Sequence, residues 1–359
     1  MKILELTRLY QPSVGGMERF VRDRTRIYRA LGADCTVLTT TASTEKQSQS
    51  EPDGDVIRLR EYTPYTIVPG LGSRLTDEYD LISVNLLGRY YSDYAILRYA
   101  SRRQKIMLTP YFAFHTERFR FMKQLFESFA FPVLLSRVDV LVALTQCERR
   151  FWIERFHVDE NKVVVIPPFV APAPESPERA GTASSRSLLY VGRAGVNKKT
   201  DLLLKAFLGI PDASLTLTLT LRPCDVDGSL RDAVMNDKRI SLLGYVDEEE
   251  KKRLIADAAA VVFPTSWESF GYVAFEAAAA KKPLLCSDIP VLRELHGNAG
   301  ALLFRNDEEG IRLALQEFIR SDERRRKEMG EANYRNARKF SFDHACEQYA
   351  QLLRMAGYG

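Results

Sequence analysis

Short apolar runs rich in β-branched residues alternate with helical patterns along almost the whole chain, and this alternation constrains the fold more than any other feature. It is typical of βαβ units, in which parallel strands form one sheet and helices cover its faces. In the first half we expect strands at 2–7, 35–40, 56–60, 81–85, 105–110, 138–144 and 163–167. In the second half we expect strands at 187–192, 214–221, 240–244, 260–264, 283–287 and 300–304. The sequence therefore predicts an α/β protein with two doubly wound sheets.

A segment that suits neither helix nor strand separates the two sets of strands. Five prolines between 167 and 177 are followed by the glycine- and serine-containing stretch 181–187. This composition is typical of a linker, and a chain of 359 residues exceeds the usual size of one domain. We therefore predict a first lobe over 1–168, a linker over 169–186 and a second lobe over 187–339. Helices are expected near the end of the chain at 308–320, 323–339 and 343–356.

The composition excludes several classes of protein. Hydrophobic residues make up 45% of the chain and charged residues 27%, which is ordinary for a globular protein and unlike a disordered chain. A net charge of +4 is too small to indicate nucleic-acid binding. The five cysteines are widely spaced, which argues against a disulfide framework and a zinc site. No signal peptide or membrane-spanning apolar run is recognisable, so we expect a cytoplasmic location.

Candidate ligand-binding residues should follow the strands, because ligands of doubly wound sheets bind where the carboxyl ends of strands meet the next helices. In the first such turn, Gly15 and Gly16 lie directly before a predicted helix. Paired glycines allow backbone N–H groups to approach an anion at the positive end of a helix. A simple flexible turn explains two glycines equally well. The G-x-G-x-x-G pattern is absent, so no nicotinamide or flavin site is indicated.

The second lobe begins with a strand whose following loop carries two cations, Arg193 and Lys198. The pattern of a P-loop does not fit. Asn197 stands in place of its second glycine, and Lys199 in place of the Ser or Thr that holds magnesium. An arginine and a lysine on one short loop can neutralise a diphosphate without a metal ion. Two solvated surface cations are the simpler alternative.

The most informative segment is 263–281, which is rich in alanine and aromatic residues. We expect Ser269 to be the N-cap of a helix that runs through Ala280. Glu276 would then lie about two turns inside this apolar helix, where its carboxylate needs donors to offset desolvation. The vicinal hydroxyls of a ribose are suitable donors.

Glu268 would lie in the loop before that helix. The backbone N–H groups of Phe270, Gly271 and Tyr272 would point outward nearby, because the first turn of a helix leaves its N–H groups unused. A carboxylate beside such donors could bind sugar hydroxyls. Alternatively, Glu268 only complements the helix dipole.

Together these segments resemble the family-4 group of retaining glycosyltransferases, which have the GT-B fold. The matching motifs, in chain order, are Pro-Ser-Val-Gly-Gly-Met-Glu at 12–18, Tyr-Val-Gly-Arg at 190–193 with Lys198 five residues on, Gly-Tyr-Val at 244–246, and Pro264-x3-Glu268-x-Phe-Gly-x4-Glu276. The resemblance extends over nearly the whole chain. It implies two Rossmann-like lobes with a deep inter-lobe cleft, and a C-terminal helix over 340–359 that returns to the first lobe.

The resemblance also implies roles for individual residues. Arg193 and Lys198 would bind the donor diphosphate, and Glu276 would bind the ribose. Glu268 would meet the transferred sugar and phosphate together with the backbone of Phe270, Gly271, Tyr272 and Val273. The base would lie near Tyr245 and Val246, and the glycines at 15 and 16 would approach the diphosphate from the first lobe.

The same resemblance implies the chemistry. The anomeric configuration would be retained and no metal ion or other cofactor would be essential. In the front-face mechanism usually assigned to this group, the leaving phosphate helps to deprotonate the acceptor hydroxyl. The acceptor, a glycan or a lipid-linked glycan, would bind the first lobe.

Two positions depart from the family pattern. Family members often carry a histidine in the loop after the strand equivalent to 105–110; this chain has His115 there, while some relatives place the histidine where Tyr111 stands. His115 is therefore a candidate catalytic residue that contacts the sugar, with a structural histidine as the alternative. Lys199 replaces the glycine that commonly follows the loop lysine, which adds positive charge.

Two other functions remain open at this level. The first is another enzyme with the GT-B fold, such as a sugar epimerase or a phosphorylase, although a phosphorylase requires a Schiff-base lysine and the lysines here lie on the donor loop or on surface helices. The second is a non-catalytic scaffold that binds nucleotide or glycan. Such proteins typically lose their charged donor contacts, whereas all four candidates are present here, at 193, 198, 268 and 276.

The stretch 118–135 combines cations with aromatic and apolar residues, among them Phe119, Phe121, Leu125, Phe126 and Phe129. This composition suits a helix at the surface of an anionic membrane. Packing of the apolar face on the sheet is the alternative. We expect peripheral association with the cytoplasmic leaflet.

Overall fold

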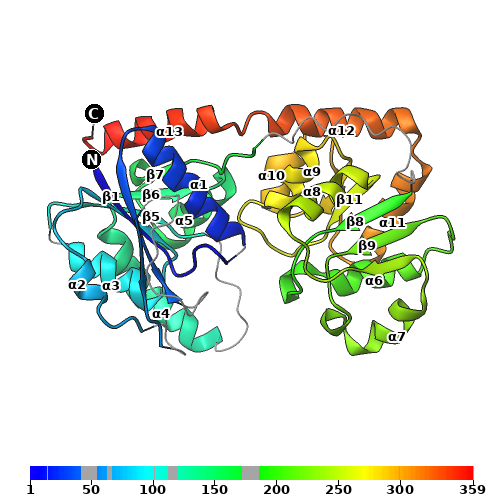
Figure 1. The fold of residues 1–359 in the computed structure, drawn as a ribbon, viewed down its shortest axis with the longest axis horizontal. Coiled ribbons are helices and arrows are strands. Elements are labelled where there is room, and N and C mark those ends of the chain that lie inside the picture. The colour runs from blue at the N-terminus through cyan, green and yellow to red at the C-terminus, as the bar shows by residue number, and fades with distance from the viewer. Residues whose placement is uncertain are drawn as a thin grey trace. The chain divides into compact units, whose positions relative to one another are not determined.

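The structure, a computed structural model, describes residues 1–13, 15–41, 55–62, 67–100, 102–111, 120–171, 186–298 and 300–358. Contacts divide the chain into two compact units (Figure 1). The first unit combines Met1–Phe169 with Phe342–Gly359, and the second comprises Val170–Ser341. Each unit is built around its own parallel sheet.

The first unit contains a seven-stranded sheet in the order β3-β2-β1-β4-β5-β6-β7, with every pairing parallel. Its strands are β1 (Lys2–Leu6), β2 (Asp34–Thr40), β3 (Val56–Leu59), β4 (Leu81–Asn85), β5 (Lys105–Thr109), β6 (Val140–Ala143) and β7 (Val163–Val165). Its helices are α1 (Gly16–Ala30), α2 (Leu71–Arg74), α3 (Tyr90–Tyr99), α4 (Arg120–Ser136), α5 (Gln146–Phe156) and α13 (Phe342–Met355).

Helices cover both faces of this sheet, which explains why its strands read as nearly continuous apolar runs. Successive residues of a strand point to opposite faces. In β1, Ile3 packs in the cluster with α1 and α13, whereas Leu4 and Leu6 pack in the cluster with α3 and α4. Tyr349 of α13 stacks edge-on against Tyr28 of α1, with ring centroids 5.6 Å apart. The last helix of the chain therefore completes the core of the first unit.

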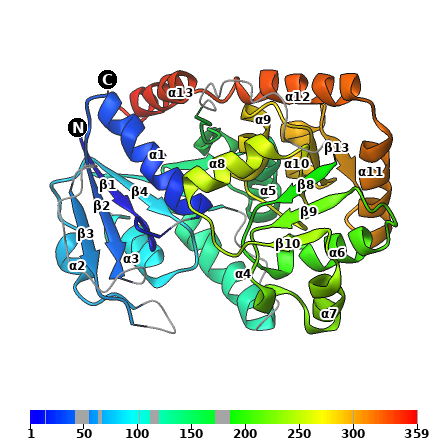
Figure 2. The same cartoon turned by 45° about the vertical axis from the view of Figure 1, so that its right-hand side comes forward.

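The second unit contains a six-stranded parallel sheet in the order β10-β9-β8-β11-β12-β13, whose strands β8, β9 and β10 can be followed in Figure 2. Its strands are β8 (Ser187–Tyr190), β9 (Thr216–Leu219), β10 (Ile240–Leu242), β11 (Ala260–Phe263), β12 (Leu284–Ser287) and β13 (Leu302–Phe304). Its helices are α6 (Thr200–Leu208), α7 (Gly228–Asn236), α8 (Glu248–Asp257), α9 (Tyr272–Ala279), α10 (Pro290–His296), α11 (Glu308–Arg320) and α12 (Glu323–Ala337).

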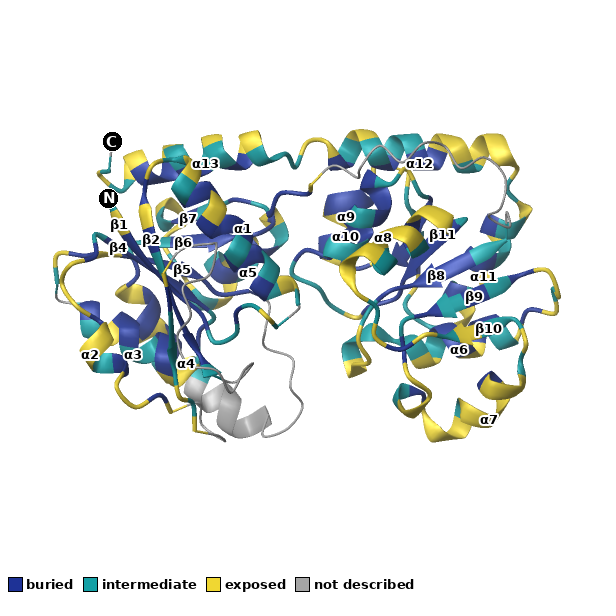
Figure 3. Cartoon of the chain, in the orientation of Figure 1, coloured by how far each residue is buried: buried dark blue, intermediate teal, exposed yellow. Residues whose placement is uncertain are grey.

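The predicted fold class is confirmed: the chain forms two doubly wound parallel sheets, and each predicted strand overlaps an observed one. In both units the central strands are buried, while the outward faces of the helices are exposed (Figure 3). None of the described helices combines the length and the apolarity needed to cross a bilayer. The predicted linker lies largely outside the described residues, because 172–185 are not among them.

The predicted start of the helix that carries Glu276 is wrong. Gly271, not Ser269, is the N-cap, and α9 ends at Ala279. Gly271 has a left-handed φ of 86°, and a Cβ at this position would lie 3.2 Å from the ring of Phe263. The left-handed turn that a glycine permits therefore sets where the helix begins. Glu276 is the fifth residue of α9, little more than one turn inside it rather than two.

Candidate active site

The two loops that carry the candidate cation and carboxylate leave neighbouring strands. The strand β8 pairs with β11, so the loop after Tyr190 and the loop after Phe263 emerge side by side at the carboxyl edge of the sheet. The backbone N–H of Ser266 donates to the carbonyl of Asn197 at 2.7 Å, which ties one loop to the other. Ligands of doubly wound sheets bind at this edge.

Lys198 and Glu268 form an ion pair between these loops. The Lys198 ammonium donates to Glu268 Oε1 and lies 5.2 Å from the centroid of the Phe263 ring. Both charged side chains are largely buried. The carboxylate and the face of the ring, which attracts cations, both hold the ammonium in place.

The loop that carries Glu268 is anchored to the ends of the next two strands. The Thr265 N–H donates to Ser287 Oγ at 2.8 Å, and the Asn306 side-chain amide donates to the Thr265 carbonyl at 3.0 Å. The Thr265 hydroxyl donates to the Trp267 carbonyl at 2.8 Å. Such supporting bonds hold a site in one geometry before a ligand arrives.

The backbone predicted to meet the transferred sugar lies at the beginning of α9. Phe270 is buried and its ring stacks on Phe275 at 4.4 Å between centroids. The N–H groups of Ala274 and Phe275 donate to the Gly271 carbonyl. Tyr272 and Val273 therefore occupy the first turn of the helix, where N–H groups favour anions.

Glu276 has a partner that the sequence did not reveal. Lys251 of α8 donates to Glu276 Oε1 at 2.9 Å, and only 14% of the lysine side chain and 15% of the glutamate side chain are exposed. Lys251 also lies 2.9 Å from Glu248 Oε2 on its own helix. In the sequence this residue is one of two adjacent lysines that follow three glutamates, so no pattern distinguishes it from Lys252.

The exposed Arg193 lies in a tight turn after β8. The Gly192 N–H donates to Thr220 Oγ1 at 3.0 Å, and the Tyr190 hydroxyl donates to the Arg193 carbonyl at 3.3 Å. A Cβ at Gly192 would lie 2.7 Å from the Tyr190 hydroxyl, so the turn has no room for a side chain there. Burial, and then the negative charge of Glu268, raise the pKa of the Tyr190 phenol, which therefore stays a hydrogen-bond donor.

The predicted base-binding residues lie between β10 and α8. Gly244 has a left-handed φ of 74°, and its N–H donates to the Leu221 carbonyl at 2.9 Å. Beyond this turn Tyr245 is 77% exposed, and Val246 is partly buried. Asp247 then caps α8 by accepting from the Glu250 N–H at 2.8 Å.

The remaining candidates belong to the first unit. Gly15 is the N-cap of α1 in extended conformation, and Gly16 is the first helical residue. The Gly15 carbonyl accepts from the Arg19 N–H at 3.0 Å. His115 lies outside the described residues.

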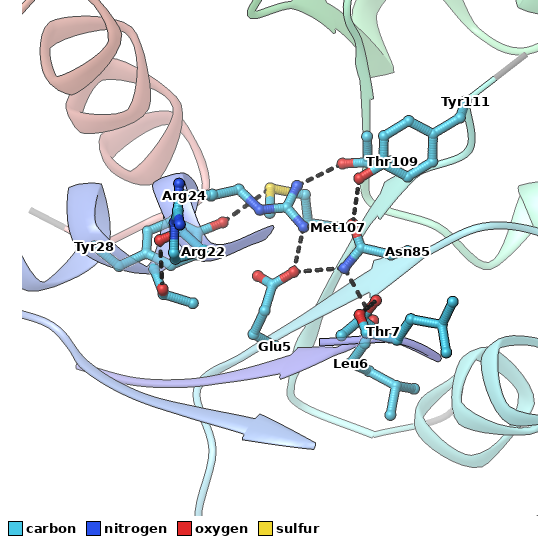
Figure 4. A network of polar contacts seen from close by, with 12 residues as sticks. Glu5, Leu6, Thr7, Arg22, Arg24, Tyr28, Asn85, Met107, Thr109 and Tyr111 are labelled. Atoms are coloured by element: carbon cyan, nitrogen blue, oxygen red, sulfur yellow. Dashed lines mark hydrogen bonds and ion pairs between the residues drawn. The ribbon is translucent and has the colours of Figure 1, made fainter. Parts of the chain in front are cut away.

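A buried polar network lies at the carboxyl edge of the first sheet (Figure 4). The Arg24 guanidinium contacts Glu5 Oε1, and it donates to Asn85 Oδ1 at 2.8 Å and to Thr109 Oγ1 at 2.6 Å. The Tyr111 hydroxyl donates to the same Asn85 oxygen at 2.8 Å. The network therefore joins α1 to the ends of β1, β4 and β5.

This network positions the residue that leads into the segment containing His115. Tyr111 is buried, has a left-handed φ of 55°, and packs edge-on against Phe20 at 5.8 Å. A non-glycine residue in this conformation must be held by its surroundings. In the sequence, the clue to the network is Glu5, a carboxylate inside the otherwise apolar strand segment 3–6.

Comparison with known proteins accounts for both units. Residues 14–173 match the family model described as Glycosyltransferase Family 4, and residues 175–336 match the one described as Glycosyl transferases group 1. The motifs between Tyr190 and Glu276 lie inside the second match, and the motif at 12–18 overlaps the start of the first. The chain belongs to the GT-B glycosyltransferases.

Curated relatives of this GT-B glycosyltransferase have names that specify different acceptors. A D-inositol 3-phosphate glycosyltransferase of Kineococcus radiotolerans is 31% identical over 254 residues, which is 62% of this chain and 58% of the relative. A GDP-mannose:cellobiosyl-diphosphopolyprenol alpha-mannosyltransferase of Xanthomonas oryzae is 26% identical over 327 residues, which is 84% of this chain and 82% of the relative. The match thus spans less than two thirds of the first relative's length.

Solved structures show the same fold. The sucrose-phosphate synthase of Thermosynechococcus elongatus has a TM-score of 0.77 at 20% identity, and the alignment covers 99% of this chain and 98% of the synthase chain. Anabaena HepE in complex with UDP has a TM-score of 0.78 at 18% identity, and the alignment covers 99% of this chain and 100% of the HepE chain. The GT-B fold is therefore common to chains whose sequences have diverged widely.

Proposed function

We propose that this GT-B glycosyltransferase transfers a sugar from a nucleoside-diphosphate sugar to a hydroxyl of a glycan or lipid-linked acceptor, with retention of configuration and without an essential metal ion. The observation that carries the proposal is the pair of lysine–glutamate contacts, Lys198 with Glu268 and Lys251 with Glu276, at one edge of the second sheet. Charged side chains that are largely buried at the ligand-binding edge of a sheet favour binding of a charged, hydroxyl-rich ligand.

The charges suit a diphosphate leaving group. Lys198 is held by the loops themselves, Arg193 is exposed on the same loop, and the beginning of α9 supplies backbone N–H groups. Cations and helix N-termini stabilise the negative charge that develops on a departing phosphate. This arrangement supplies the role that a metal ion plays in other transferases.

Retention is proposed through a front-face reaction. The acceptor oxygen forms its bond to the anomeric carbon on the face from which the phosphate leaves. The proton of the acceptor hydroxyl passes to the leaving phosphate oxygen, and the nucleoside diphosphate is released. Glu268 and His115 are then proposed to contact the sugar and not to act as a covalent nucleophile. Proton NMR of the first product formed would show the donor's anomeric configuration, and an inverted product would refute the proposed mechanism.

The names of two similar proteins support the choice of donor and acceptor. The Xanthomonas relative is named for GDP-mannose and a diphosphopolyprenol acceptor, and HepE was solved with UDP. A thermal-shift panel of UDP, GDP, ADP and dTDP tests the donor site directly. We expect one nucleotide to raise the melting temperature strongly, and no shift with any of the four at saturating concentration would refute the proposed function.

Transfer itself needs a separate assay. Radiolabelled nucleotide sugars incubated with and without a glycan acceptor distinguish transfer from epimerisation, phosphorolysis and simple binding. Activity should persist in EDTA. Activity that EDTA abolishes and magnesium restores would contradict the metal-independent mechanism.

Peripheral association with the cytoplasmic membrane surface is part of the proposal. On α4, Phe129 is 72% exposed and Val133 is 51% exposed, and the exposed Arg137 follows the helix. The other side chains that suggested membrane binding, at 119, 121, 125 and 126, lie outside the described side chains. Apolar residues beside cations favour anionic lipid surfaces. Co-sedimentation with anionic vesicles at low salt, reduced by Phe129→Ser, would support membrane binding, and no co-sedimentation would favour a water-soluble acceptor.

A further inference from the structure

Lys251 differs from its neighbours on α8. Lys252 pairs with Glu249, but 50% of its side chain and 83% of the glutamate side chain are exposed. Lys251 instead reaches across to α9, and it and Glu276 are both largely buried. Exposed pairs within one helix contribute little to stability. Of these two ion pairs, only the one between α8 and α9 is held in a fixed geometry by the packing of the fold.

The environment of Glu276 explains why such a partner matters. Its neighbours Ala274, Phe275, Ala277 and Ala278 are buried, so little water surrounds the base of this side chain. A glutamate side chain loses considerable rotamer freedom when it is held in one conformation. Because the Lys251 ammonium already holds the glutamate in one conformation, part of this rotamer freedom is lost before a ligand binds. The ammonium occupies only one of about four acceptor positions of the carboxylate.

The position of Lys251 in the chain links two parts of the proposed donor site. Residues 244–246 precede α8, whose first residue is Glu248. Lys251 is the fourth residue of that helix, and its ammonium donates a hydrogen bond to Glu276, the fifth residue of α9. The helix that follows the segment assigned to the base is thereby linked through one side chain to the carboxylate assigned to the ribose.

We propose that Lys251 is a positioning residue that holds Glu276 toward the ribose hydroxyls and thereby makes the donor site select ribonucleotides over 2′-deoxyribonucleotides. The inference rests on the proposed function, because it takes Glu276 to bind the ribose. Lys251 acts through Glu276 and neutralises its charge, so the carboxylate can lie in the same site as the anionic diphosphate.

The test compares nucleotides that differ by one hydroxyl. Dissociation constants of the wild type, Lys251→Met, Lys251→Arg and Lys252→Met are measured by calorimetry for UDP and 2′-deoxy-UDP, and for GDP and 2′-deoxy-GDP. Hydrogen bonds to a charged group contribute enough for the wild type to prefer the ribonucleotide by about tenfold or more. We expect Lys251→Met to reduce this ratio to about one to threefold, Lys251→Arg to retain most of it, and Lys252→Met to leave it unchanged.

The outcomes separate the inference from the function on which it rests. If Lys251→Met weakens binding of the ribonucleotide and of the 2′-deoxyribonucleotide by the same factor, or leaves both dissociation constants unchanged, the inference is overturned. The proposed donor site would still stand. A wild type that binds neither of these pairs, nor ADP or dTDP, overturns the proposed function and the inference together. Circular dichroism checks that each variant folds, and Lys251→Gln replaces Lys251→Met in the comparison if the latter does not.

Discussion

Replacing Arg24 with methionine should destabilise the first unit strongly, because it leaves a carboxylate buried without its cation. Arg24 and Glu5 are both fully buried, and the guanidinium also donates to Asn85 and Thr109. Removing one partner of a buried ion pair costs about 3–5 kcal/mol. For a unit of this size, each kcal/mol lowers the melting temperature by about 2–4 °C, so we expect a decrease of about 6–20 °C.

Urea unfolding and thermal unfolding, followed by circular dichroism, measure this loss. The double variant Glu5→Leu/Arg24→Met should recover most of it, since replacing both members of a buried pair by apolar groups is often close to neutral. Lys105→Met is the matched control, because the Lys105–Asp139 pair at 3.0 Å is exposed and should contribute less than about 1 kcal/mol. An Arg24→Met variant that loses no more than the control, or a double variant less stable than either single one, would refute the reasoning.

Three further predictions concern the second unit. Glu276→Ala should weaken nucleotide binding by about 1.5–3 kcal/mol, because the ribose hydroxyls lose a charged acceptor; calorimetry measures this, and unchanged affinity in a folded variant would make Glu276 structural. Burial lowers the pKa of His296 from 6.5 to about 4, so the unfolded chain binds the proton at a higher pH than the folded chain. The free energy of unfolding should therefore fall by about 3 kcal/mol as the pH drops from about 6.5 to about 4. This pH dependence should be smaller in His296→Phe, and an identical loss in both proteins would contradict it. Gly330→Ala should destabilise the packing of α12 by about 1–3 kcal/mol, because the new Cβ would lie 2.0 Å from the Lys281 carbonyl oxygen. Gly228→Ala, with no atom within 4 Å of its Cβ, is the control for a urea titration, and equal midpoints for the two variants would rule the clash out.

Local sequence patterns were sufficient to predict the helices and strands and to single out the loops of the candidate site. Alternating strands and helices depend on residues a few positions apart, so the periodicity of 105–110 or 308–320 could be recognised without knowing what packs against it. The Pro264-x3-Glu268-x-Phe-Gly-x4-Glu276 motif likewise located one candidate loop and one candidate helix. The exact start of that helix was mistaken, because the constraint that selects Gly271 comes from the ring of Phe263 and not from capping preferences alone.

The sequence by itself determined the fold class, the order of the strands along the chain and the residue types able to bind a diphosphate and a ribose. Only the tertiary structure decided which charges meet. Lys251 and Lys252 are adjacent and chemically identical, yet one is held against Glu276 and the other is exposed. Glu5, Arg24 and Asn85 come from three separate elements and form one buried network. Such pairings depend on which helix faces which strand once the core has packed, and a single sequence carries no local signal for contacts between segments that folding alone brings together.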